Sequence, residues 1–169
     1  LHYLEVPFVY PNWGKYGIAG KADGALKRPG FSKRQLVEIK TIKNRDSRTG
    51  PYAVCFEDLV EPQGKHTAQL NMYLHMASDL YGNDFDSGFI IYGAKNTQEW
   101  KRYNIRLMPE LIDKLKVKTE IIESFLEKGA MPLRLGKDKT DRKCRYCDWK
   151  DTCWTEHTFA EVDRRAAKK

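Results

Sequence analysis

The segment that most restricts the fold is residues 35–43, QLVEIKTIK, which alternates apolar and charged side chains after the turn-forming sequence KRPG. A strand directs successive side chains to opposite faces, so Glu38 and Lys40 share one face while Ile39 lies on the other. Burying a carboxylate and an ammonium group is costly unless the two are paired. The segment therefore predicts a strand that carries either an exposed ion pair or a functional site.

The other apolar patterns predict a mixture of strands and helices. Strands are expected over residues 16–26, 88–93 and 99–107, and helices over residues 66–81 and 109–128. Residues 130–160 are expected to be irregular. The sequence thus predicts an α/β (α+β) protein with a small mixed sheet flanked by helices. We expect a core over residues 1–135 and a cysteine-rich segment with a basic tail over residues 136–169.

The net charge of +7 is concentrated in one region of the chain. Residues 13–48 hold ten Lys and Arg against three Asp and Glu, whereas residues 49–100 hold two against seven. We expect the acids to lie elsewhere on the surface. The basic side chains of Lys27, Arg28, Lys33 and Arg34 would then attract a phosphate backbone.

The sequence gives no indication of a membrane protein. No apolar run approaches the roughly 20 residues that span a bilayer, and the mean hydropathy is −0.67. No leader with a basic and then an apolar region is evident. We therefore expect a cytoplasmic protein of a bacterial, archaeal or phage-infected cell, with no membrane partner.

Two further groups of residues extend the Glu38–Lys40 pair. Asp23 lies on the preceding strand, and an antiparallel hairpin would bring it beside Glu38. Two converging carboxylates make a hard-oxygen site that suits Mg²⁺ or Mn²⁺. Gln69 and Tyr73 are four residues apart and share one face of the predicted helix. Taken alone, Tyr73 fits a core position and Gln69 a solvated one.

The order of these motifs resembles the PD-(D/E)XK nuclease superfamily, and more narrowly its RecB-like branch. That branch includes CRISPR-associated adaptation nucleases and many phage exonucleases. The segments GKADG, EIK and QLNMY carry the resemblance over about residues 16–75. It implies a restriction-endonuclease-like core and a metal-dependent DNA nuclease, with an exonuclease as the first expectation, that acts in DNA processing, recombination or phage replication.

The resemblance also implies a role for each matched residue. Asp23, Glu38 and the Ile39 carbonyl oxygen would bind Mg²⁺ or Mn²⁺, and Lys40 would assist the attacking water. Gln69 and Tyr73 would help to hold DNA, either single-stranded or with free ends.

Two features depart from the family pattern. Ala22 stands where the superfamily name has Pro. The branch also completes its metal site with a His or Glu from an N-terminal helix, which we expect to be missing here. His2 and Glu5 are the candidates for that role, and the sequence around Glu5 indicates a strand. An incomplete site leaves open the alternative of a catalytically idle module that binds nucleic acid or protein.

Three cysteines near the C-terminus have the spacing of metal ligands. Cys144, Cys147 and Cys153 follow a C-x₂-C-x₅-C pattern, which suits thiolates that share one metal. In the RecB-like branch the same triplet and an upstream Cys hold a [4Fe–4S] cluster. The local alternative is Zn²⁺ with His157 as the fourth ligand, and a third is a set of unrelated thiols. Cys55 lies in an apolar stretch that predicts a core thiol.

Two other polar residues fit more than one position. His66 precedes Gln69 by three residues, where contact to a phosphate is possible but an exposed side chain at the helix start is the simpler interpretation. Lys95 follows the strand over residues 88–93. Contact with DNA and an ordinary loop position fit it equally well.

Overall fold

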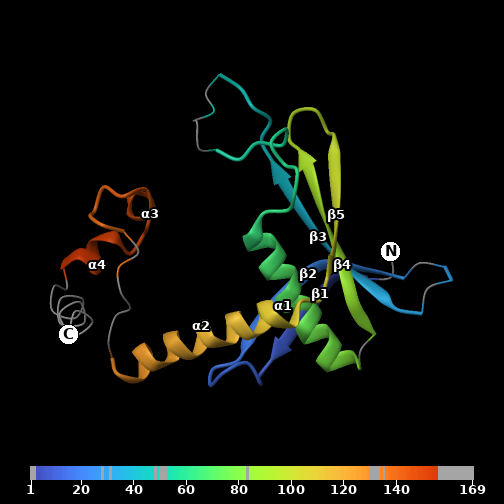
Figure 1. The fold of residues 1–169 in the computed structure, drawn as a ribbon, viewed down its shortest axis with the longest axis horizontal. Coiled ribbons are helices and arrows are strands. Elements are labelled where there is room, and N and C mark those ends of the chain that lie inside the picture. The colour runs from blue at the N-terminus through green and yellow to red at the C-terminus, as the bar shows by residue number, and fades with distance from the viewer. Residues whose placement is uncertain are drawn as a thin grey trace. The chain divides into compact units, whose positions relative to one another are not determined.

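The fold is built on a five-stranded mixed sheet with the strand order β1-β2-β3-β4-β5 (Figure 1). The computed structural model describes residues 3–27, 29–30, 32–47, 49, 53–82, 84–129, 134 and 136–155. The strands are β1 (Tyr3–Tyr10), β2 (Ile18–Lys27), β3 (Arg34–Ile42), β4 (Phe85–Ala94) and β5 (Trp100–Arg106). Neighbouring strands are antiparallel except for β3 and β4, which are parallel. With its helices, this sheet forms an α+β fold.

Helix α1 (Gly64–Tyr81) connects the two parallel strands and packs on the sheet (Figure 1). Parallel strands cannot be joined by a tight turn, so a crossover connection is required. The buried side chains of the helix and of these strands form one core cluster, which includes Leu36, Leu70, Leu74, Ala77 and Ile90. Because side chains two residues apart on a strand share a face, Glu38 lies on the same side of β3 as the core residue Leu36.

The sheet is irregular beside Asp23. The register of β1 with β2 pairs Leu4 with Gly24 and Val6 with Ala22 but does not pair Glu5 with Asp23. Glu5 adopts a left-handed backbone conformation with φ of 55°. This conformation is uncommon for a residue with a side chain and costs about 1–3 kcal/mol. Ala22 and Ala25 are both buried although they lie three positions apart. Asp23 itself is exposed between buried Ala22 and Gly24, so it keeps the regular alternation, which breaks only between Gly24 and Ala25.

The chain divides into two compact units, Leu1–Lys116 and Val117–Lys169. Helix α2 (Pro109–Glu127) crosses this division, and its Ile112 and Leu115 pack in the core of the first unit. The second unit contains the short helices α3 (Arg142–Arg145) and α4 (Lys150–Thr155). The division therefore falls inside α2, whereas the sequence places a boundary after residue 135.

Each strand and each long helix predicted from the sequence is present, with ends that differ by a few residues. The indication of a strand around Glu5 is also confirmed, because Glu5 lies in β1. The prediction of irregular structure over residues 130–160 is wrong in part, since α3 and α4 lie within it. Among the described helices, none has both the length and the apolar character needed to cross a membrane.

The first prediction concerns Gly88, where β4 passes closest to its neighbours. A Cβ added at Gly88 would lie 2.6 Å from the carbonyl oxygen of Leu36 and 3.3 Å from Cδ2 of Leu70. We expect Gly88→Ala to lower the free energy of unfolding by about 1–3 kcal/mol, because backbone must move to admit the methyl group. Urea denaturation measures this.

Gly93→Ala on the same strand is the matched control, since a Cβ there meets nothing within 4 Å. Equal stability changes in the two variants would contradict the close approach at Gly88.

Candidate active site

The side chain of Asp23 is hydrogen-bonded to β3 just beyond the point where the backbone pairing of β2 with β3 ends. The antiparallel register runs from Lys27 with Arg34 to Gly24 with Val37 and extends no further. Beyond it, the backbone N–H of Ile39 donates to Oδ2 of Asp23 over 2.6 Å. A side-chain carboxylate thus replaces a backbone acceptor and is held against the middle of β3. The hairpin predicted from the sequence does bring Asp23 beside the Glu38–Lys40 segment.

Glu38 is a buried carboxylate with one hydrogen-bond partner among the residues that the structure describes. Its side chain is 2% exposed, and Oε1 accepts from Nζ of Lys40 over 2.5 Å. Its other oxygen, Oε2, is buried and has no partner among the described residues. Burial raises the pKa of Glu38, the Lys40 ammonium group opposes this, and the Asp23 charge adds to it. An exposed ion pair is therefore excluded, and the site retains an unsatisfied acceptor.

The carboxylates fit a hard divalent cation. An unpaired buried oxygen costs about 1–3 kcal/mol, and a cation would remove this cost while offsetting the repulsion between Asp23 and Glu38. Mg²⁺ is commonly bound through one or two carboxylates, with waters completing its six ligands. In the described part of the chain, no three His, Cys, Asp or Glu side chains gather to hold a metal. Asp23 and Glu38 would therefore need the Ile39 carbonyl oxygen and waters.

Gln69 and Tyr73 of α1 are hydrogen-bonded to each other and packed on the sheet. Nε2 of Gln69 donates to the Tyr73 hydroxyl over 3.0 Å. The Tyr73 ring stacks on Phe8, with ring centroids 5.5 Å apart, and lies against Gly20. A Cβ at Gly20 would approach Cε1 of Tyr73 to 2.5 Å, so glycine is what admits the ring. Gln69 is thus half-buried and bonded rather than simply solvated.

His66 is not the exposed helix-start residue that the sequence suggests. It is half-buried, and its Nδ1 lies 2.8 Å from the hydroxyl of Tyr92 on β4. Tyr92 is paired with Lys40 in the parallel register, so the two residues share the face that also carries Glu38. Sequence reasoning missed Tyr92, because nothing in its local pattern shows which residue of β3 it lies beside.

The basic residues that begin β3 are paired with acids. Nζ of Lys33 lies 2.8 Å from Asp86, and Nε of Arg34 lies 2.9 Å from Asp84. The expectation that acids of residues 49–100 lie elsewhere is therefore wrong for these two. The cause is the parallel register, which brings the starts of β3 and β4 together. Arg28 lies outside the described residues.

Three lysines without an acidic partner among the described residues lie near the opposite end of β3. Lys43 and Lys95 follow the ends of the two parallel strands, where the backbone N–H of Lys95 donates to the carbonyl oxygen of Ile42 over 3.0 Å. Lys65 lies in the first turn of α1. All three lysines are exposed and form no ion pair with a described residue. Lys40 lies toward this end of the strand. The acids Glu57 and Asp58 also lie there, bound to Asn44 and Arg45.

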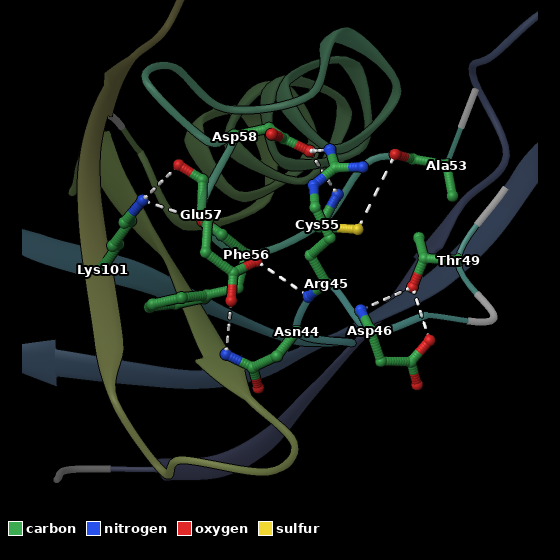
Figure 2. A network of polar contacts seen from close by, with 10 residues as sticks. All are labelled: Asn44, Arg45, Asp46, Thr49, Ala53, Cys55, Phe56, Glu57, Asp58 and Lys101. Carbon is green, nitrogen blue, oxygen red and sulfur yellow. Dashed lines mark hydrogen bonds and ion pairs between the residues drawn. The ribbon is translucent and has the colours of Figure 1, made fainter. Parts of the chain in front are cut away.

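A polar network fixes the segment that leads from β3 to α1 (Figure 2). Nζ of Lys101 on β5 donates to the carbonyl oxygen of Phe56 over 2.8 Å and lies 4.8 Å from the centre of its ring. Nδ2 of Asn44, just after β3, donates to Oε1 of Glu57 over 2.9 Å. These contacts anchor the chain before it enters α1 and so help to set where His66 lies.

The cysteine triplet lies in the second unit. Cys144 is in α3, Cys153 is in α4, and Cys147 lies between them. All three are free thiols and do not form a metal-holding group with the other side chains described. The thiol of Cys144 packs on Gly136, where an added Cβ would lie 2.4 Å from Sγ. His157 lies outside the described residues.

Cys55 belongs to the first unit and is 1% exposed. Its backbone N–H donates to Oδ2 of Asp58 over 3.1 Å. The prediction of a buried thiol is confirmed, and Sγ of Cys55 lies 3.8 Å from the carbonyl oxygen of Ala53 within the segment of Figure 2.

Comparison with known proteins identifies the fold but no family. No family model and no curated protein matches this chain. The chain is similar to a solved protein described as "Crystal structure of SSO0001", with a TM-score of 0.51 and 23% sequence identity. The match covers 89% of this chain and 59% of the other, so the chain spans about three-fifths of that protein. At this identity the likeness shows a shared fold and nothing about activity.

The second prediction follows from the burial of Glu38. Because the pKa of Glu38 is raised in the folded state, the folded protein holds this proton to higher pH than the unfolded chain does. The stability of the wild type relative to Glu38→Gln should therefore fall as the pH rises from 4.5, the ordinary pKa of a glutamate side chain, through the raised pKa. Each tenfold difference in proton affinity between the folded and unfolded chains corresponds to a fall of about 1.4 kcal/mol.

Urea denaturation at a series of pH values, without divalent cations, measures this difference. Glu61→Gln removes an exposed carboxylate and is the control. The same pH profile for both variants would show that burial of Glu38 is not the cause.

Proposed function

We propose that this chain is a metal-dependent DNA nuclease that hydrolyses phosphodiester bonds with Mg²⁺ or Mn²⁺. The observation that carries the proposal is the buried Oε2 of Glu38, which has no partner among the described residues although Lys40 and Asp23 lie beside it. The ordered motifs GKADG, EIK and QLNMY support it through their similarity to the RecB-like branch of the PD-(D/E)XK superfamily. We extend the proposal to a restriction-endonuclease-like core and to an exonuclease of DNA processing, recombination or phage replication.

The two carboxylates and Ile39 would hold the cation. Asp23 is oriented by the N–H of Ile39, and Glu38 presents a free oxygen from beneath α1. A divalent cation bound there would polarise the scissile phosphate and lower the pKa of a bound water. Glu38 would turn its charge toward the cation, which weakens its hold on Lys40. The ammonium group is then available to orient the attacking water and to offset charge on the phosphate oxygens.

The surroundings of the site suit a nucleic acid. Exposed Lys43, Lys65 and Lys95 lie where β3 ends and α1 begins, which favours non-specific attraction of phosphates. Gln69 and Tyr73 lie further along α1 as a bonded pair, which suits contact with the strand that is being cut.

A catalytically idle module that binds nucleic acid or protein is the second candidate. It is favoured by the small number of side-chain ligands, since Asp23 and Glu38 are joined by no third acidic or histidine ligand in the described residues. This alternative predicts DNA binding without cleavage even at high Mn²⁺.

The third prediction separates the two candidates. We expect Mn²⁺-dependent degradation of linear DNA by the wild type, and a loss of about 10²-fold or more in kcat for Asp23→Ala and for Lys40→Ala. Lys114→Ala is the matched control, because it removes an exposed lysine of α2 that has no place in the proposed site. Equal rates in all four proteins would sink the assignment of the site, and gel-shift binding without any cleavage would favour the idle module.

The cysteine triplet leads to the fourth prediction. We propose that Cys144, Cys147 and Cys153 bind a [4Fe–4S] cluster, with Zn²⁺ and His157 as the alternative. A brown protein that contains iron is expected, and Cys147→Ser should lose the colour and most of the iron. A colourless protein with one equivalent of zinc would favour the alternative. Cys55→Ser is the control and should leave the metal content unchanged, because this thiol is buried in the first unit. Wild-type protein that contains neither iron nor zinc would contradict both the cluster and the zinc site.

A further inference from the structure

The position of His66 is fixed by a hydroxyl group that is itself buried. Tyr92 is 0% exposed, and its oxygen accepts the backbone N–H of Gln63 over 3.0 Å. The same hydroxyl lies 2.8 Å from Nδ1 of His66, with ring centroids 5.6 Å apart. The three groups join the start of α1 to the middle of the sheet.

The hydrogen bonds of Tyr92 decide which nitrogen of His66 carries the proton. A phenol has one hydrogen to donate, and a buried hydroxyl requires an acceptor for it. Gln63 is a donor, so the acceptor is Nδ1 of His66. An imidazole whose Nδ1 accepts must carry its proton on Nε2, which makes Nε2 a hydrogen-bond donor on the other side of the ring.

The imidazole is held neutral in this position. Burial lowers the pKa of His66, and the charges of Lys40 and Lys65 lower it further. The influence of Lys40 agrees with the register, in which Tyr92 lies directly beside Lys40 on the same face of the sheet. His66 therefore acts as an uncharged N–H donor in a positively charged neighbourhood.

Lys40 and His66 thus each offer a hydrogen-bond donor near the residue pair Lys40 and Tyr92, on the face of the sheet that also carries Glu38. The ammonium group of Lys40 cannot bond to an N–H group, and its present partner is Glu38, the residue that would turn to a cation. A group with several acceptor oxygens and negative charge satisfies both donors at once. A phosphodiester has these properties, whereas a neutral or cationic ligand does not.

We infer that Nε2 of His66 binds a non-bridging oxygen of the DNA phosphate that lies at the carboxylates, next to Lys40. His66 is then a substrate-binding residue, and Tyr92 is a positioning residue that fixes its tautomer. This inference rests on the proposed nuclease function, and it adds a second phosphate ligand from a different element of the fold.

Two substitutions at His66 separate phosphate binding from a purely structural role. His66→Gln keeps an amide donor near the place of Nε2, whereas His66→Asn keeps a polar group near the place of Nδ1, beside Tyr92. The measurements are the affinity for linear DNA in Ca²⁺, which replaces Mn²⁺ for binding, and the rate of cleavage in Mn²⁺. Thermal unfolding of each variant monitors the anchoring of α1.

We expect His66→Asn to bind DNA about tenfold more weakly and to cleave it more slowly, while His66→Gln stays within about twofold of the wild type. A structural role predicts the reverse order, because only Asn keeps the contact with Tyr92. The reverse order, equal losses in both variants, or no loss in either would overturn the inference.

Asp23→Ala in the same assays distinguishes failure of the inference from failure of the proposed function. If Asp23→Ala abolishes cleavage while both His66 variants behave as wild type, the nuclease proposal stands and the inference falls. If the wild type binds DNA without cleaving it, the nuclease proposal falls. Phosphate binding by His66 is then supported if His66→Asn binds DNA more weakly than His66→Gln, and overturned if it does not. If the wild type does not bind DNA, both fall.

Discussion

The carboxylate of Glu38 lies on the face of the sheet that α1 covers, with one oxygen bound to Lys40 and the other without a partner in the described part of the chain. A folded chain rarely buries a charge in this way, because the unsatisfied oxygen and the nearby charge of Asp23 both reduce stability. Such a cost is typical of binding and catalytic sites, where a ligand supplies the missing partner. The candidate site is therefore recognised by an unpaired, buried carboxylate oxygen and not by a deep cavity.

Two features of the topology bring the charged groups of this site together. The pairing of β2 with β3 stops after Gly24 and Val37, which leaves the N–H of Ile39 to bind the Asp23 side chain. The crossover from β3 to β4 then places α1 over the same face and brings Tyr92 beside Lys40. Residues from β2, β3, β4 and α1 thus meet at one place, although they are spread over most of the first unit.

Much of this arrangement follows from local sequence patterns. The alternation in QLVEIKTIK places Glu38 and Lys40 on one face, and four-residue spacing places Gln69 beside Tyr73, as the structure has them. The parallel register of β3 and β4 is not encoded locally, because it depends on how a helix packs between two strands. For that reason the ion pairs of Lys33 and Arg34 and the contact between His66 and Tyr92 were not predicted.

The most direct test of this account is the anomalous diffraction of crystals soaked in Mn²⁺. The account predicts a manganese peak in contact with Oε2 of Glu38 and with the Asp23 carboxylate, and a longer distance between Glu38 and Lys40 than the present 2.5 Å. Glu38→Gln crystals treated in the same way should lack the peak. If the wild-type site has no peak at saturating Mn²⁺ and Glu38 keeps its contact with Lys40, the buried carboxylate is not a metal ligand and the account is contradicted.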